Sequence, residues 1–153
     1  MEQDFDSAFK QLEESVMDDM RASYSEKVID FFLNPRNLGQ IPGADGFGRV
    51  TGPCGDTMEV YLTVRGDRVV NASFWTDGCG PSIASGSMVT ELAKGKSIAE
   101  AGKIGQQDVL HALDGLPEES VHCALLAANT LREAIKDYLS SRREPWKKAY
   151  ERR

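Results

Sequence analysis

The sequence is poor in cysteine and contains no long hydrophobic run. Its 153 residues include three cysteines, too few for a disulfide framework, and no stretch approaches the roughly 18 apolar residues of a membrane-spanning helix. The opening residues, MEQDFDSAFK, are acidic and lack the basic and apolar regions of a signal peptide. We therefore expect a cytoplasmic protein with reduced thiols and no membrane contact.

An excess of positive charge is also lacking. The formal net charge is −6, so we do not expect nucleic acid as a partner. Residues 1–20 carry seven acidic side chains and one basic one, whereas residues 142–153 carry six basic and two acidic ones. Apolar residues recur at steps of three and four within 4–20, which predicts an amphipathic helix. We expect residues 1–22 to be an acidic helical extension, either docked or frayed, and residues 142–153 to be a basic tail.

Alternating apolar and polar residues predict a small sheet. Residues 57–64 place Met58, Val60, Leu62 and Val64 on one face, and Glu59, Tyr61 and Thr63 on the other. The stretches 47–52 and 69–76 supply two further strands, and the glycine and aspartate within 65–68 favour a turn. The spacing predicts a three-stranded antiparallel meander.

Helical signals lie on both sides of this sheet. Ser23 and Glu26 have capping-box spacing and precede a short helix that Pro35 ends. Proline and glycine bound a second helix at 81–94, and short helices are expected after Ser97 and at 106–113. A long helix is expected over about 118–141. Its predicted buried face carries Val121, Leu125, Leu131, Ile135 and Leu139.

The predicted fold class is therefore α+β. A three-stranded antiparallel sheet packs against helices, and a long helix closes the domain at its C-terminal end.

Two of the three cysteines lie in similar glycine-rich loops. Cys54 lies in TGPCGD and Cys79 in GCGP, and the meander brings both loops to the same edge of the sheet. Cys123 follows His122 near the beginning of the last helix. Glycine loops and helix N-termini favour the thiolate by lowering the pKa of a cysteine. We therefore expect these thiols to have a chemical role.

Three thiolates beside Asp56 or His122 form a soft ligand set, which suits Zn²⁺ or an iron–sulfur cluster. The cysteines do not have the paired spacing of a zinc finger. The fourth ligand stays open, because His122 adds no charge, whereas Asp56 adds a negative charge and is a weaker, harder ligand. A weak fourth ligand would suit a site that holds a cluster and later releases it.

Four ordered blocks of the chain resemble the iron–sulfur cluster assembly scaffold family of the IscU/NifU N-terminal type. The resemblance covers residues 23–141, which we expect to form the scaffold domain. The blocks are YSEKVIDFFLNPRNLG (24–39), GPCGDTMEVYLTV (52–64), DGCGPSIASGSMVTELAKGKS (77–97) and HCALLAANTLREAIKDY (122–138).

The resemblance implies a function and a site. Cys54, Cys79 and Cys123 would bind a cluster, Asp56 would tune its lability and can ligate metal, and His122 is a candidate fourth ligand. A 2Fe–2S cluster would be assembled de novo from iron and from sulfur that a cysteine desulfurase delivers, with Cys123 as the candidate persulfide acceptor. The cluster would then pass to apo iron–sulfur proteins, and Zn²⁺ can occupy the same site. Such a protein is a scaffold and carrier, not an enzyme, and no catalytic residue is expected.

Two features bear on partners and alternatives. Residues 116–120 read LPEES where many relatives have Leu-Pro-Pro-Val-Lys, which argues against an Hsp70-type chaperone as a partner. The alternative functions are a zinc-bound, persulfide-accepting sulfurtransferase and a structural zinc-binding interaction domain. The stretch between Cys79 and Cys123 lacks the insertion of the zinc-dependent sulfur-acceptor branch, which favours the scaffold.

Overall fold

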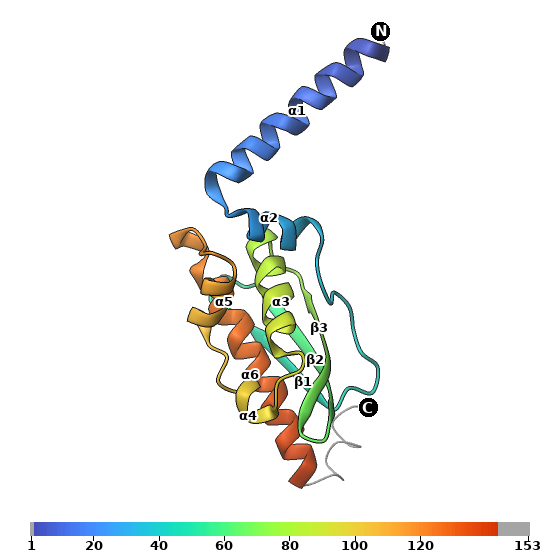
Figure 1. Cartoon of the computed structure of the whole chain (residues 1–153), viewed down its shortest axis with the longest axis vertical. Helices are drawn as coiled ribbons and strands as arrows, with labels where there is room; N and C mark the ends of the chain where they lie inside the picture. Colours follow the sequence, from blue (N-terminus) through green and yellow to red (C-terminus); the bar gives the residue numbers. More distant parts are fainter. Residues whose placement is uncertain (1, 144–153) are drawn as a thin grey trace.

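The computed structural model describes residues 2–143, so all but two residues of the basic tail expected at 142–153 lie outside the described part. A long helical arm projects from a body in which helices pack on a small sheet (Figure 1). In chain order the elements are α1 (Glu2–Ser23), α2 (Glu26–Leu33), β1 (Gly46–Thr51), β2 (Thr57–Arg65), β3 (Arg68–Thr76), α3 (Gly80–Ala93), α4 (Ile98–Ala101), α5 (Gln106–Ala112), the 3₁₀ helix η1 (Glu118–Ser120) and α6 (Val121–Arg143).

The sheet is the predicted antiparallel meander, with strand order β1-β2-β3. Met58 near the beginning of β2 lies opposite Val50 of β1 and Thr76 of β3. The loop after β1 and the loop after β3 therefore leave the sheet at one edge. This register confirms the α+β fold class and brings the two cysteine-bearing loops to the same edge of the sheet.

Most of the predicted pattern on β2 agrees with the structure. Met58, Val60 and Leu62 are fully buried, but Glu59, which the alternation placed on the polar face, is also buried at 8% exposure. The Tyr61 hydroxyl donates a hydrogen bond to Glu59 Oε1 at 3.1 Å. This bond offsets the cost of removing the carboxylate from water.

Helix α6 packs very closely on β1 and also contacts β2, and two glycines of β1 make this approach possible. A Cβ atom at Gly48 would lie 2.4 Å from the Thr130 carbonyl oxygen, and one at Gly46 would lie 2.5 Å from that of Ala134. The buried residues of α6 are correspondingly small over much of its length. They include Ala124, Ala127, Ala128, Leu131, Ala134 and Ile135.

The structure corrects three details of the helices. Leu125 and Leu139 are 42% and 40% exposed, so they do not belong to the buried face of α6. Residues 118–120 form a 3₁₀ turn before α6 rather than its first turn. The N-cap of α2 is Ser25, whose hydroxyl accepts a hydrogen bond from the Val28 amide, and not Ser23, which ends α1.

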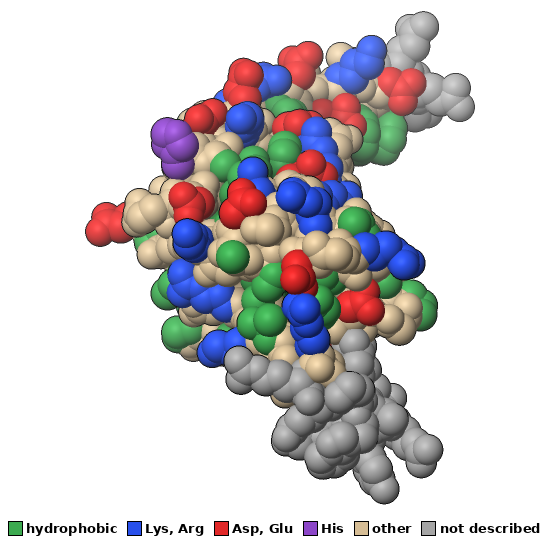
Figure 2. Space-filling view, turned by 60° about the horizontal axis from the view of Figure 1, so that its bottom comes forward, with side chains coloured by type: hydrophobic (Ala, Val, Ile, Leu, Met, Phe, Trp, Pro, Cys, Tyr) green, Lys and Arg blue, Asp and Glu red, His purple; other side chains and the backbone are tan. Residues whose placement is uncertain are grey.

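The acidic extension forms α1, which ends at Ser23, shortly before α2 begins at Glu26. This helix projects away from the body (Figure 1). Most of its apolar stripe is not covered by the domain, since Phe5 is 71% exposed and Leu12 is 61% exposed. No helix within residues 2–143 is long and apolar enough to cross a membrane. On the face shown in Figure 2, basic and acidic side chains of the described residues are interspersed, without a continuous basic surface.

Candidate functional site

The Cys54 loop is a tight turn between β1 and β2. The Gly55 amide bonds to the Gly52 carbonyl at 3.0 Å, and the Gly52 amide bonds to the Asp56 carbonyl at 2.8 Å. Gly55 has a φ of +86°, a backbone conformation that favours glycine. The turn leaves the Cys54 thiol exposed at the edge of the sheet.

Asp77 joins this turn to the loop that contains Cys79. Its Oδ1 atom accepts a hydrogen bond from the Thr57 amide at 2.8 Å. The Thr76 hydroxyl donates to the Thr57 carbonyl at 2.7 Å. The two cysteine loops are thus tied together by hydrogen bonds as well as by the sheet register.

Cys79 is the N-cap residue of α3. Its backbone is extended, with φ −81° and ψ −172°, and its side chain makes no capping hydrogen bond. Its thiol is exposed and lies at the positive end of the helix dipole. Pro81 occupies the first turn of α3, where its missing N–H costs no helical hydrogen bond.

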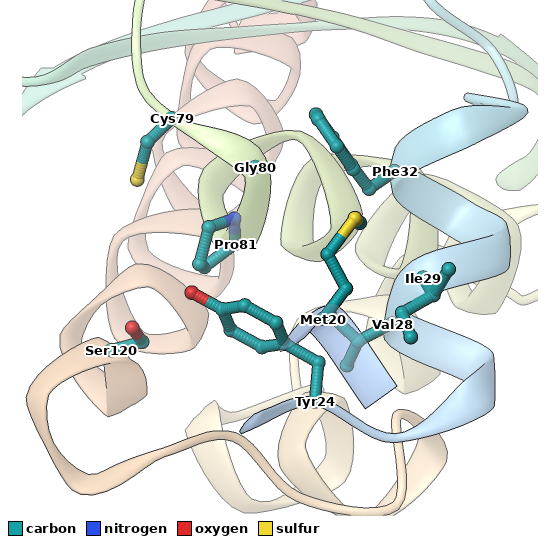
Figure 3. Close-up of a pocket in the computed structure, with 9 residues that line it drawn as sticks. All are labelled: Met20, Tyr24, Val28, Ile29, Phe32, Cys79, Gly80, Pro81 and Ser120. Carbon is teal, nitrogen blue, oxygen red and sulfur yellow. The ribbon is translucent and has the colours of Figure 1, made fainter. Parts of the chain in front are cut away.

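An apolar pocket of about 310 Å³ adjoins Cys79 (Figure 3). Figure 3 shows the Tyr24 ring between α2 and the beginning of α3. Cys79 and Pro81 lie across the pocket from Phe32 of α2. Its lining residues are Met20, Tyr24, Val28, Ile29, Phe32, Cys79, Gly80, Pro81 and Ser120. Met20 belongs to α1, so the arm contributes to the wall of this pocket through its last turn.

Cys123 lies in the first turn of α6 and is 1% exposed. Burial raises the pKa of its thiol, and a hydrogen bond from Ser82 acts in the opposite direction. Electrostatic interactions with the neighbouring Cys79, Asp56 and Cys54 side chains raise the pKa further. The expectation that the site lowers thiol pKa values is therefore wrong for Cys123, because desolvation outweighs its position near a helix N-terminus.

His122 lies between two of the sulfur atoms. Its Nε2 atom is 3.3 Å from Cys54 Sγ and 3.7 Å from Cys123 Sγ. The His122 ring nitrogen thus lies near the sulfur of its chain neighbour Cys123 and near that of Cys54, which is 68 positions earlier in the chain. Asp56, in the same loop as Cys54, also reaches this region. Its Oδ2 atom lies 3.3 Å from the Ser82 hydroxyl.

The side chains gather without forming a closed metal site. Within residues 2–143, no group of three or more His, Cys, Asp or Glu side chains is arranged to hold a metal ion. Cys54 and Cys79 are exposed, whereas Cys123 is buried in the core. Soft thiolates with an imidazole and a carboxylate nearby fit zinc or an iron–sulfur cluster in chemical type.

One residue of this region was not predicted from the sequence. Ser82 is completely buried, and its hydroxyl lies 3.4 Å from Cys123 Sγ and 3.3 Å from Asp56 Oδ2. The sequence could have indicated this residue, because Ser82 follows Cys79 by three positions and therefore lies one helical turn away from it on α3.

Together the fold and this region define a small α+β protein with a cluster of thiols at one edge of its sheet. The family model described as NifU-like N terminal domain matches residues 23–145. The chain belongs to this family, as its four sequence blocks predicted.

Similar proteins with curated names support this membership. The chain is 53% identical over 116 residues to "Iron-sulfur cluster assembly scaffold protein IscU 1" of Archaeoglobus fulgidus, a match that spans 75% of this chain and 76% of the relative. It is 45% identical over 125 residues to "Iron-sulfur cluster assembly scaffold protein IscU" of Escherichia coli K12, spanning 78% and 97% of the two chains.

Solved structures share the fold. The N-terminal part of a nitrogen-fixing NifU-like protein from Brucella abortus superposes with a TM-score of 0.61 at 20% identity, covering 76% of this chain and 94% of the other. A structure described as a scaffold protein for the SUF system, from Fervidobacterium islandicum AW-1, superposes with a TM-score of 0.60 at 24% identity and covers 73% and 96%.

Proposed function

We propose that this protein is a scaffold on which an iron–sulfur cluster is assembled and from which the cluster passes to apo-proteins. The observation that carries the proposal is the meeting of His122 with the sulfur atoms of Cys54 and Cys123, beside the loop of Cys79. The names of the relatives, which are iron–sulfur cluster assembly scaffold proteins, support the same function.

The cluster is cargo in this function, and we infer that Cys54, Cys79 and Cys123 hold it. Two of these thiols are exposed and the third is buried. An open arrangement of this kind suits cargo that must be built and then released, because a closed cage would have to break for both steps. We infer that the cargo is a 2Fe–2S cluster, and Zn²⁺ is expected to compete for the same thiolates.

His122 is the better placed candidate for the fourth ligand. Its ring nitrogen already lies near two sulfur atoms, whereas Asp56 reaches Cys123 through the Ser82 hydroxyl. We assign His122 to the ligand set and Asp56 to control of cluster release. Three thiolates outweigh the positive charge of the Fe–S core, so the ligated cluster is negative overall. A carboxylate beside it adds repulsion among the negative ligands, which destabilises the assembled site.

The sulfur donor that we infer is a cysteine desulfurase, and the recipients are apo iron–sulfur proteins. Cys123 is our candidate for the persulfide acceptor, although its burial requires the site to open before a donor can reach it. Residues 116–120, which include η1, supply no second proline or lysine for an Hsp70-type chaperone. We further infer a carrier without turnover chemistry that resides in the reducing cytoplasm, where its three free thiols persist.

Anaerobic reconstitution tests this function. The protein is incubated with ferrous iron, cysteine and a cysteine desulfurase, and is then mixed with an apo-ferredoxin. Visible charge-transfer bands that grow on the protein and later appear on the ferredoxin are the expected result. Zinc that iron cannot replace, together with efficient persulfide uptake, would instead establish the sulfurtransferase. Zinc without sulfur uptake would leave a structural zinc-binding domain.

A further inference from the structure

Ser82 is a buried hydroxyl that lies between two side chains of the proposed site. It is completely buried on α3, and its Oγ atom lies 3.3 Å from Asp56 Oδ2 and 3.4 Å from Cys123 Sγ. A hydroxyl has one hydrogen to donate and can accept hydrogen bonds as well. It can therefore donate to the carboxylate while it accepts from the thiol, or donate to the sulfur directly.

The backbone around Ser82 leaves it little freedom to move. A Cβ atom at Gly78 would lie 2.6 Å from Ser82 Oγ and 3.0 Å from Asp56 Oδ2, so this wall of the site has no room for a side chain. Ser82 also lies on the first turn of α3, whose N-cap is Cys79. Its hydroxyl is thus closely packed at a point where the Cys54 loop, α3 and α6 converge.

We propose that Ser82 is a positioning residue that fixes the Asp56 carboxylate and the Cys123 sulfur relative to one another before metal binds. The inference rests on the proposed function, because it assumes that Cys123 receives the metal. Cys123 is the one buried thiol of the three, so its sulfur cannot be aligned by solvent. Partners behind a metal ligand orient that ligand, and their loss typically costs about tenfold to a hundredfold in metal affinity.

The chain offers a matched control in Ser85. It is also completely buried on α3, one turn after Ser82, but its hydroxyl has no hydrogen-bond partner among the described residues. Removing the Ser85 hydroxyl therefore deletes the same atom from the same helix without touching the site.

Cobalt binding to the full chain under anaerobic conditions tests the inference, with Co²⁺ as a spectroscopic probe of the thiolates. We expect S82A to bind Co²⁺ about tenfold more weakly than wild type, with altered ligand-field bands, while S85A stays within about twofold of wild type. The variants S82T and S82V have the same shape and share any packing cost. We expect S82T to bind more tightly than S82V, because only threonine retains the hydroxyl.

The possible outcomes separate the two proposals. If S82A or S82V matches its hydroxyl-bearing counterpart in both affinity and spectrum, the role of Ser82 is overturned while the scaffold function stands. If wild type shows no thiolate-to-cobalt bands at all, the proposed function fails and the inference fails with it. A comparison of thermal unfolding in metal-free S82A and S85A separates loss of positioning from loss of folding.

Discussion

The ring nitrogen Nε2 of His122 lies 3.3 Å from the sulfur of Cys54, although the two residues are 68 positions apart in the chain. If His122 is the fourth ligand, H122A will weaken zinc binding more than D56A does, because the imidazole is already next to two sulfur atoms. Competition with a coloured zinc chelator measures both affinities. H111A is the matched control, since His111 is the other histidine of the sequence and is exposed on α5. Equal losses in H122A and H111A would contradict this assignment.

Asp56 is expected to shorten the life of the bound cluster. D56A removes a carboxylate that repels the thiolate ligands of the cluster, so the cluster should persist longer and transfer more slowly. Decay of the visible absorbance and the rate of transfer to apo-ferredoxin give the two quantities. The isosteric D56N variant separates the loss of charge from the loss of shape. An unchanged or shorter cluster lifetime in both variants would count against the role of Asp56.

The buried thiol of Cys123 should be slow to react in the metal-free protein. Burial raises its pKa, so the thiolate fraction of the folded protein is smaller than that of the unfolded chain at any pH below the folded pKa. Alkylation of Cys123, followed by peptide mass spectrometry, should therefore begin at higher pH in the native protein than in urea. By the same linkage, this thiol stabilises the fold below its unfolded pKa and ceases to do so as pH rises through its folded pKa. A native protein that is alkylated at Cys123 as readily as in urea would contradict the burial.

The approach of α6 to β1 depends on the missing side chain of Gly48. In G48A the new Cβ would lie 2.4 Å from the Thr130 carbonyl oxygen and 2.5 Å from the Ala134 amide nitrogen. The helix must shift, and we expect a loss of about 1–3 kcal/mol in the free energy of unfolding. Urea denaturation measures the change. G52A is the control, because its Cβ would meet only ordinary contacts at 3.7 Å or more and should be nearly neutral.

Local patterns in the sequence were sufficient to predict the sheet and the positions of Cys54 and Cys79 at its edge. Alternation over 57–64 and the turn at 65–68 predicted the meander, and an antiparallel meander necessarily returns Cys79 to the edge that carries Cys54. Proline and glycine at the ends of α3 located that helix to within one residue. These features depend on neighbours in the chain, so a single sequence contains them.

Features that depend on tertiary packing were not predictable in the same way. Hydropathy gives leucine more weight than alanine, so it placed Leu125 in the core, whereas α6 actually buries its small residues against Gly46 and Gly48. The burial that raises the pKa of Cys123 likewise comes from elements distant in the sequence. The exposed stripe of α1 shows the same limit, because an amphipathic pattern does not specify the surface that covers it.

The central claim is that three thiols from distant parts of the chain hold one cluster. The most direct measurement is the iron and acid-labile sulfide retained after anaerobic reconstitution of wild type and of C54A, C79A and C123A, each checked for folding by circular dichroism. The account predicts a cluster on wild type and a severe loss in each folded variant. A full complement of iron and sulfide in all three variants would contradict it.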